Sequence, residues 1–417
     1  MSAEKNSRYV GLGLLAWGGG TIFNLVLFRF IAYEPLRLAL NVSHAQYGLM
    51  MSVFSAAGMV SYFPGGWLAD RFSARKLLTL AYASTGLAGL YFATFPSYVI
   101  CLLIHAFWGV STSLIFWAAM LKSCKDMAGQ DEQGRFFGLL EGGRGVVSTV
   151  TGFAAVGVLG LAQGQDPLSG LRWALFLQAG FTLSAAVLTW IMFKDQAGTK
   201  TQASVGSDTM ATIRNPLVWA ASGMVFACCG AKACLTYVNP YLTGIFAMSA
   251  ALAGSLSIVW TYGAQFVGAP ISGFIADRVG HRPKVLFLLF VIVAIFFIPL
   301  AVMPADPALL AVLLVTATGC FLTIYAIRGL YFAVVGDLDI PAAISGSAIG
   351  LISMVGFTPD IFVYPLAGHI IDLHHSSAEG YKIVFGLATG FSVFGAVLGG
   401  LVTMIVSRRR KARGAAS

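Results

Sequence analysis

Long apolar stretches recur along the whole chain and are separated by short polar segments. Each stretch has roughly 20 residues or more, which lets a helix cross about 30 Å of hydrocarbon. A transmembrane barrel would instead show short segments of alternating polarity, so strands are not expected. The pattern predicts an all-α polytopic membrane protein with twelve transmembrane helices. The predicted spans are residues 9–33, 45–69, 77–96, 98–121, 136–162, 170–193, 216–243, 249–276, 284–303, 307–333, 342–372 and 380–407.

The composition agrees with a membrane environment. Hydrophobic residues make up 58% of the 417 positions, charged residues only 10%, and the mean hydropathy is +0.81. Soluble domains carry about 25% charged residues. The chain also lacks the glycine-rich nucleotide loop ending in Gly-Lys-Ser/Thr, so coupling to ATP within this chain is not expected. No catalytic triad or metal-ligand spacing is recognisable, so we expect no enzyme activity, no cofactor and no metal.

The distribution of lysine and arginine predicts the orientation. With both termini in the cytoplasm, 20 of the 26 Lys and Arg residues fall on cytoplasmic segments, and only Arg37, Arg172 and Lys382 fall on the opposite side. The positive-inside rule therefore favours this topology. The net charge of +9 is then an insertion signal and an attraction to anionic lipid, and no nucleic-acid partner is expected. We expect a multi-pass plasma-membrane protein, of the bacterial inner membrane, that works as a monomer.

A sequence repeat divides the chain into two halves. The stretch GGWLADRFSARKLL follows the second span and SGFIADRVGHRPKVL follows the eighth, which places Asp70 and Asp277 207 residues apart in a chain of 417. Transporters use such repeats to build a pathway at the repeat interface. We predict an N-terminal six-helix bundle at 1–193, a polar cytoplasmic linker at 194–214, and a C-terminal six-helix bundle with a basic tail at 215–417.

The repeated loop resembles the signature of the major facilitator superfamily, and the likeness covers the whole chain. The resemblance implies a secondary transporter in which this loop latches the cytoplasmic side of the two halves. The first copy departs from the family pattern at Ser73, where glycine is usual, which is expected to loosen that turn. The matching residues are Gly66, Asp70, Arg71 and Arg75 in the first copy, and Gly273, Asp277, Arg278, Gly280 and Arg282 in the second.

Two cations inside predicted helices are candidates for substrate binding. Arg29 lies 41 residues before Asp70 and Lys232 lies 45 before Asp277, so the two halves place a cation at nearly the same point of the same helix. Charges at this depth cost about 2.5–3.5 kcal/mol each, so they should face a cavity or a partner. The organic-anion branches, of the anion:cation symporter and organophosphate types, imply basic residues there that bind an anionic group. The alternative is a structural role, which the nearby Glu34 makes realistic for Arg29.

Other candidates surround this pair. Asp360 follows Pro359 in the eleventh span and could exchange a proton as a cation finds its substrate, or form a permanent ion pair or cap. His105 could titrate, although a lone histidine is more often a packing residue. Arg328 belongs either to the cytoplasmic end of the tenth helix or to its interior. Four tyrosines could contact an anion or shape its pocket, or only pack: Tyr33, Tyr237, Tyr262 and Tyr325.

The stretch LLEGGRGVV carries an opposite pair of charges, Glu141 and Arg144. Their spacing of three allows a mutual ion pair on a helix. They lie about 9 and 13 Å inside the cytoplasmic boundary, which favours a hinge or inner gate over a substrate site or an inert pair. On the helical projection the charges share a face with glycines and should point toward protein. The face expected toward lipid or outer helices contains Phe136, Leu139, Leu140, Val146, Val147 and Val150.

These residues predict a secondary transporter of a small organic anion, working by alternating access and coupled to protons as a symporter. Two cations would suit a sugar acid, another carboxylate, a phosphate ester or a sulfonate. One alternative is a proton-driven exporter of drugs or metabolites. Another is an anion sensor that does not transport.

Overall fold

The computed structural model describes residues 2–128, 132–161, 167–194, 209–337 and 345–414. These residues are predominantly helical, as the apolar stretches predict, and ten of their helical segments are long and apolar enough to cross a membrane. Helices α3 and α4 coincide with the two remaining predicted spans. The prediction of an all-α polytopic membrane fold is therefore confirmed.

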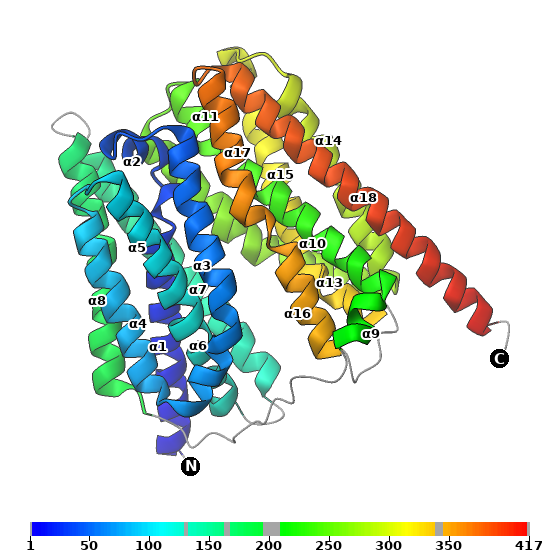
Figure 1. Cartoon of the computed structure of the whole chain (residues 1–417), viewed down its shortest axis with the longest axis horizontal. Helices are drawn as coiled ribbons and strands as arrows, with labels where there is room; N and C mark the ends of the chain where they lie inside the picture. Colours follow the sequence, from blue (N-terminus) through cyan, green and yellow to red (C-terminus); the bar gives the residue numbers. More distant parts are fainter. Residues whose placement is uncertain (1, 129–131, 162–166, 195–208, 338–344, 415–417) are drawn as a thin grey trace. The chain divides into compact units, whose positions relative to one another are not determined.

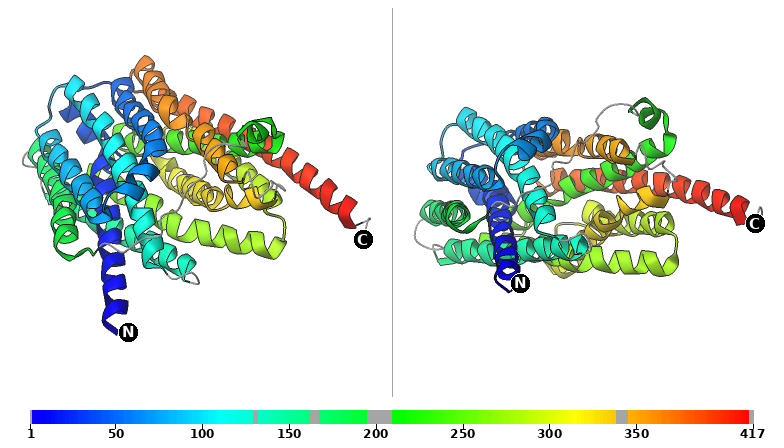
Figure 2. Two further views of the ribbon diagram at one scale, coloured as in Figure 1. Left: turned by 60° about the horizontal axis from the view of Figure 1, so that its bottom comes forward. Right: turned by 90° about the horizontal axis from the view of Figure 1, so that it is seen from below.

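The chain forms two compact units (Figures 1 and 2). The first unit comprises Met1–Ala203 together with Met248–Tyr262, and the second comprises Ser204–Ala247 and Gly263–Ser417. The short stretch Met248–Tyr262 thus packs with the first unit although the repeat assigns it to the second half. The division into halves at 194–214 remains a prediction.

The first unit is a bundle in which α1 packs against α7 and α8, α4 against α8, and α3 against α5. Its core includes Leu15, Tyr82, Phe116, Met120 and Leu140. Its helices are α1 (Ser2–Val26), α2 (Tyr33–Ala39), α3 (His44–Arg71), α4 (Ala74–Phe92), α5 (Tyr98–Val110), α6 (Ala118–Met127), α7 (Gln133–Leu161), α8 (Pro167–Met192) and α12 (Ala250–Ile258). Its short segments are the 3-10 helix η1 (Phe28–Phe30) and the π-helix η2 (Ser111–Trp117); the π-helix η3 (Val259–Gly263) leads from this unit into the second.

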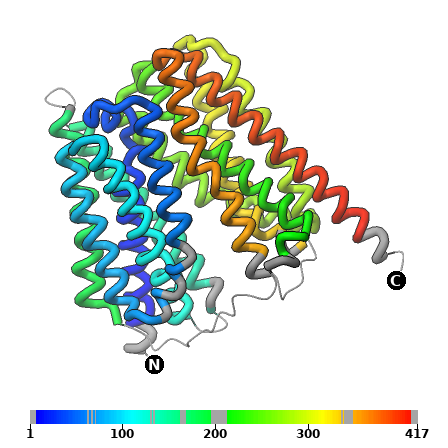
Figure 3. Tube along the Cα trace, viewed as in Figure 1, coloured from blue at the N-terminus to red at the C-terminus, as the bar shows by residue number. Residues whose placement is uncertain are grey.

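In the second unit α10 is central and contacts α15, α16, α17 and α18, while α14 packs along α18 and α13 along α15. Figure 3 follows α16 into α17 (orange) as consecutive segments of one predicted span. The helices are α9 (Thr209–Arg214), α10 (Pro216–Leu235), α11 (Val238–Gly244), α13 (Ala264–Val279), α14 (Arg282–Val302), α15 (Leu310–Leu330), α16 (Ser345–Gly356), α17 (Pro359–Leu373) and α18 (Ala378–Gly414). Two 3-10 helices, η4 (Pro307–Leu309) and η5 (Ala333–Asp337), flank α15.

Three consecutive glycines set the packing of α1. A Cβ atom at Gly18 would lie 2.1 Å from the ring of Tyr82, and one at Gly20 would lie 2.7 Å from Val147. Between them, a Cβ at Gly19 would lie 2.8 Å from Nε of Arg144. Small residues permit this close approach of helices in a membrane, where burial of apolar surface supplies little drive. The run therefore lets side chains of α4 and α7 lie directly against the backbone of α1.

Candidate functional site

Two predicted spans of the second unit are each interrupted by two residues. The α10–α11 span is interrupted after Leu235, and the α16–α17 span is interrupted between Gly356 and Pro359. Proline has no N–H and a fixed φ, so it suits the first position of a helix and explains the start of α17. Breaks of this kind expose helix ends within the bundle, where their partial charges can act on ions.

Three charged side chains lie at these and neighbouring helix ends. Lys232 is in the last turn of α10, Arg328 is in the last turn of α15, and Asp360 is in the first turn of α17. Cations are stabilised near the negative C-terminal end of a helix and anions near the positive N-terminal end. Each of the three charges therefore matches the dipole of its own helix.

The structure brings these three residues together. Both cations attract the carboxylate of Asp360, Lys232 more strongly than Arg328. Helix α10 packs against both α15 and α17, which places the three elements side by side. The Oδ1 atom of Asp360 is buried and accepts no hydrogen bond from the described residues. The cluster thus holds two cations and one carboxylate that is attracted by charge but not tied by a hydrogen bond at Oδ1.

Tyr325, a predicted residue, lies in this cluster together with three residues that the sequence analysis did not select: Tyr331, Cys228 and Cys229. Arg328 lies over the ring of Tyr325, with its Cζ 5.2 Å from the ring centroid, and is within electrostatic reach of Tyr331. Cys228 and Cys229 lie within electrostatic reach of both cations. These cysteines precede Lys232 by four and three residues, which places them on its face of α10. The spacing in the sequence could therefore have indicated that the two thiols lie beside Lys232.

Tyr237 supports the cluster from the break in α10–α11. It is fully buried, and its hydroxyl donates a 2.6 Å hydrogen bond to the backbone carbonyl of Tyr364 in α17. This bond connects the break after α10 to the helix that carries Asp360. The role of Tyr237 is therefore to position α17.

Arg29 lies in an aromatic environment in the first unit. It belongs to η1, just after the end of α1, and is only 3% exposed. Its Nη1 donates to the backbone carbonyl of Tyr47 at 3.1 Å, and its guanidinium lies 4.5 and 5.1 Å from the ring centroids of Tyr47 and Tyr33. Glu34 forms its salt bridge with Arg37. These contacts favour the structural alternative for Arg29.

Tyr33 and His105 also occupy packing positions. The hydroxyl of Tyr33 is 3.0 Å from Nδ1 of His44. The Nδ1–H of His105 donates to the carbonyl of Cys101 at 2.8 Å, and its ring packs edge-on against Trp108. Both side chains are buried.

The ion pair between Glu141 and Arg144 is present on α7. The Arg144 guanidinium lies 5.5 Å from the ring of Phe23 and 5.2 Å from that of Trp117, and the side chain is 14% exposed, whereas Glu141 is 47% exposed. The two predicted faces of this helix are confirmed only in part: Glu141 is exposed instead of facing protein, and on the opposite face Leu139, Val146 and Val150 are exposed as expected. Phe136 and Leu140 are buried, because they pack into the core of the first unit.

Tyr262 takes part in a polar network within the first unit. Its hydroxyl donates to Oδ1 of Asn24, and the Asn24 amide donates to the carbonyl of Ser148 at 2.6 Å and to Oγ1 of Thr151 at 2.9 Å. Nε2 of Gln178 donates to the Thr151 carbonyl at 2.6 Å. Sequence analysis missed Asn24 and Gln178, although uncharged amides within apolar spans were a usable signal.

The repeated loops differ in geometry. Gly280 ends α13 with φ +64°, a left-handed conformation that glycine adopts without a Cβ penalty. At the matching position, Ser73 is in an extended-type conformation, and its side chain accepts from the N–H of Lys76 at 3.4 Å. Serine therefore caps α4 instead of supplying a left-handed turn.

The predicted latch residues are partly described. Arg282 forms ion pairs with Asp277 at 3.3 Å and Asp337 at 4.0 Å. The guanidiniums of two others stack on rings at 4.5 Å, Arg278 on Phe274 and Arg75 on Trp190. Arg71 is exposed, and a Cβ at Gly273 would meet no neighbour. The surroundings of Gly66 and of the Asp70 side chain lie outside the described residues.

Comparison with known proteins identifies relatives along nearly the full length. The family model described as Major Facilitator Superfamily matches residues 10–359. Inner membrane protein YqcE of Escherichia coli (strain K12) is 30% identical over 399 residues, which cover 92% of this chain and 91% of that protein. Inner membrane protein YihN of the same organism is 28% identical over 412 residues, which cover 97% of each.

Solved structures share the fold. A bacterial homologue of the human lysosomal transporter Spinster, in an inward-facing and occupied conformation, has a TM-score of 0.75 at 13% identity and covers 97% of each chain. A variant of the nucleoside transporter NupG has a TM-score of 0.73 at 16% identity and covers 96% of this chain and 99% of that one. At these identities the likeness concerns the fold alone.

Proposed function

The chain belongs to the Major Facilitator Superfamily of membrane transporters, and from this premise we propose that it is a secondary active transporter that moves a small organic anion by alternating access, as a proton symporter. The observation that carries the proposal is the cluster of Lys232, Arg328 and Asp360 in the second unit. Ionisable residues are costly in a membrane and are retained where they bind a substrate or move a proton.

The anion takes the place of Asp360 between the two cations. The cluster carries two positive charges and one negative charge, so a monoanion that displaces Asp360, with Asp360 then protonated, leaves its net charge unchanged. Arg328 offers a planar fork suited to a carboxylate, phosphate or sulfonate, and Lys232 offers a compact charge. A sugar acid, another carboxylate, a phosphate ester or a sulfonate would each supply this group. Tyr325, beneath the guanidinium of Arg328, would border the bound anion.

Proton coupling follows from competition at the same cations. When the substrate anion engages Lys232 and Arg328, Asp360 loses its counter-ions in an apolar setting, which favours its protonated form. The proton enters with the substrate on one side and leaves Asp360 when the substrate leaves on the other side. The buried Oδ1, which accepts no hydrogen bond within the described chain, is a position that can receive this proton.

The remaining predicted residues have supporting roles in this proposal. Glu141 and Arg144 belong to an inner gate, and the repeated loops latch the cytoplasmic side. Arg29 and His105 hold the aromatic packing of the first unit. We place both termini in the cytoplasm and the protein, as a monomer, in a bacterial inner membrane, in keeping with the names of the Escherichia coli relatives.

The proposal is tested with purified protein in liposomes. An inward proton gradient should drive accumulation of at least one member of a panel of labelled sugar acids, carboxylates, phosphate esters and sulfonates. Lys232→Gln and Arg328→Gln should each reduce uptake by at least tenfold, whereas Lys382→Gln, a matched removal of a cation that forms an ion pair with Glu379, should not. Efflux of neutral or cationic compounds without anion uptake would establish the exporter alternative, and anion binding without movement would establish the sensor.

A further inference from the structure

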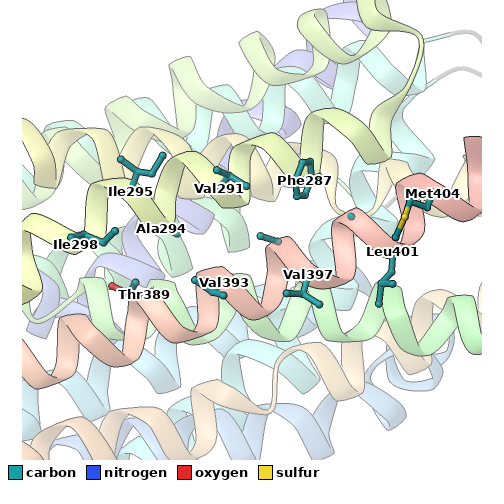
Figure 4. A pocket seen from close by; sticks show the side chains of 12 residues that line it. Phe287, Val291, Ala294, Ile295, Ile298, Thr389, Val393, Val397, Leu401 and Met404 are labelled. Atoms are coloured by element: carbon teal, nitrogen blue, oxygen red, sulfur yellow. The ribbon is translucent and has the colours of Figure 1, made fainter.

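A hollow of about 470 Å³ lies between α14 and α18 in the second unit (Figure 4). Eleven of its twelve lining residues are apolar or glycine, and Thr389 is the exception. It offers no charged group for a polar substrate. The lining residues are Phe287, Val291, Ala294, Ile295, Ile298, Thr389, Val393, Ala396, Val397, Gly400, Leu401 and Met404.

The hollow is a groove between two antiparallel helices. Gly399 lies against Phe287 and Gly395 lies against Phe290, so the start of α14 is beside the end of α18. Ala294 and Ala396 line the bottom of the groove, and their small side chains make it deeper. The walls are exposed: Ile295 is 59% and Val397 is 56% accessible. In a membrane protein such an accessible apolar surface meets lipid chains.

The length of the groove fits one leaflet. From Phe287 to Ile298 is eleven residues of α14, or about 17 Å at 1.5 Å per residue. Half of the hydrocarbon core is about 15 Å. A single acyl chain of one leaflet can therefore lie along the groove.

Exposed cations lie at one end of the groove. Lys284 is one turn before Phe287, and Arg408 and Arg409 are one turn after Met404; all three are exposed. His281 and Ser407 are hydrogen-bonded at 2.9 Å and join the two helices at this end. Arg282 is here too, but its ion pairs with acidic residues reduce its contribution.

We propose that this groove is a binding site for an anionic phospholipid, with one acyl chain along α14 and α18 and the phosphate beside Lys284, Arg408 and Arg409. Lipid chains are as apolar as the groove, so burial alone does not select one lipid over another. Selection comes from charge, at about fivefold per cation near the headgroup. Phosphatidylglycerol should therefore be retained at least tenfold more than phosphatidylcholine with the same chains.

Native mass spectrometry of the full-length delipidated protein measures this preference. The protein is titrated with phosphatidylglycerol, with phosphatidylcholine of the same chains, and with glycerol phosphate, which has the charge but no chain. Gly400→Leu fills the groove, because a Cβ there meets Phe287 only at 3.5 Å and the helix can tolerate it. Gly180→Leu is its control, since Gly180 is an exposed glycine on α8 with open space around it.

The expected result is loss of the phosphatidylglycerol preference in Gly400→Leu and in the triple variant Lys284→Gln/Arg408→Gln/Arg409→Gln, with Gly180→Leu and Lys382→Gln unchanged. Equal retention of the two phospholipids by the unaltered protein would overturn the proposal. So would binding of glycerol phosphate as strong as that of the lipid, which would indicate a site for free phosphate. A dimer that Gly400→Leu dissociates, without lipid preference, would assign the groove to a second copy of the chain.

Discussion

The balance of charge among Lys232, Arg328 and Asp360 predicts unequal effects of two neutral substitutions. Asp360→Asn leaves two cations facing each other, so the local charge rises from +1 to +2. Lys232→Gln leaves Asp360 beside Arg328, its second attracting cation, and the local charge falls to zero. Removal of one partner of a buried pair costs about 3–5 kcal/mol. Asp360 is half-buried, so we expect about 3 kcal/mol for Asp360→Asn and about 1 kcal/mol for Lys232→Gln.

Thermal unfolding in detergent measures both costs. All six cysteines are free and buried, so a thiol-reactive fluorescent dye reports the loss of structure. For a unit of about 200 residues, 1 kcal/mol shifts the midpoint by about 2–4 °C, which predicts a drop on the order of 10 °C for Asp360→Asn and about 3 °C for Lys232→Gln at pH 8. The double variant should fall between them, because Arg328 then stands without a carboxylate. A larger drop for Lys232→Gln than for Asp360→Asn would refute this account of the cluster.

Three further outcomes are expected in the same unfolding assay. Arg144→Ala should cost about 2 kcal/mol because its packed guanidinium is lost, whereas Glu141→Gln should cost less than about 0.5 kcal/mol because that side chain is largely solvent-accessible. Gly20→Ala should cost about 1–3 kcal/mol through overpacking, while Gly13→Ala, with open space at its Cβ, should stabilise by up to about 1 kcal/mol through helix propensity. Tyr262→Phe should cost about 1 kcal/mol, the net value of the hydrogen bond to its amide partner.

Each of these outcomes can fail in a specific way. Equal costs for the two members of the α7 ion pair would mean that the pair, and not the packing of Arg144, supplies the stability. A neutral Gly20→Ala would mean that α1 and α7 can move apart easily. No effect of Tyr262→Phe would mean that Asn24 satisfies its oxygen in another way.

The fold class was predictable because length and apolarity suffice to define a membrane span, whatever the neighbouring helices do. The break at Pro359 was also readable, since proline begins a helix for local reasons. The interruptions after Val26 and Leu235 were not, because neither is followed directly by proline or glycine. Tertiary contacts decide where these helices end.

The candidate site was only partly predictable for a related reason. Lys232 and Asp360 stand out as charges in apolar sequence, but Arg328 lies close to the end of its predicted span and reads equally well as a topology signal. The three residues come from helices about 100 and 30 residues apart along the chain. Their meeting depends on how α10 packs against α15 and α17, which periodicity does not specify. The burial of Phe136 and Leu140 shows the same limit, since a helix packed on several sides has no single protein-facing stripe.

The glycine run of α1 has an evolutionary consequence. Its three consecutive positions admit a phenol ring, a guanidinium and a branched aliphatic side chain respectively, so each is closed to any larger residue for a different reason. Because the three neighbours belong to two helices, no single change elsewhere can make room at all three positions. Gly18 to Gly20 should therefore vary less among relatives than the charged residues do. Relatives that differ in substrate preference should keep these three glycines.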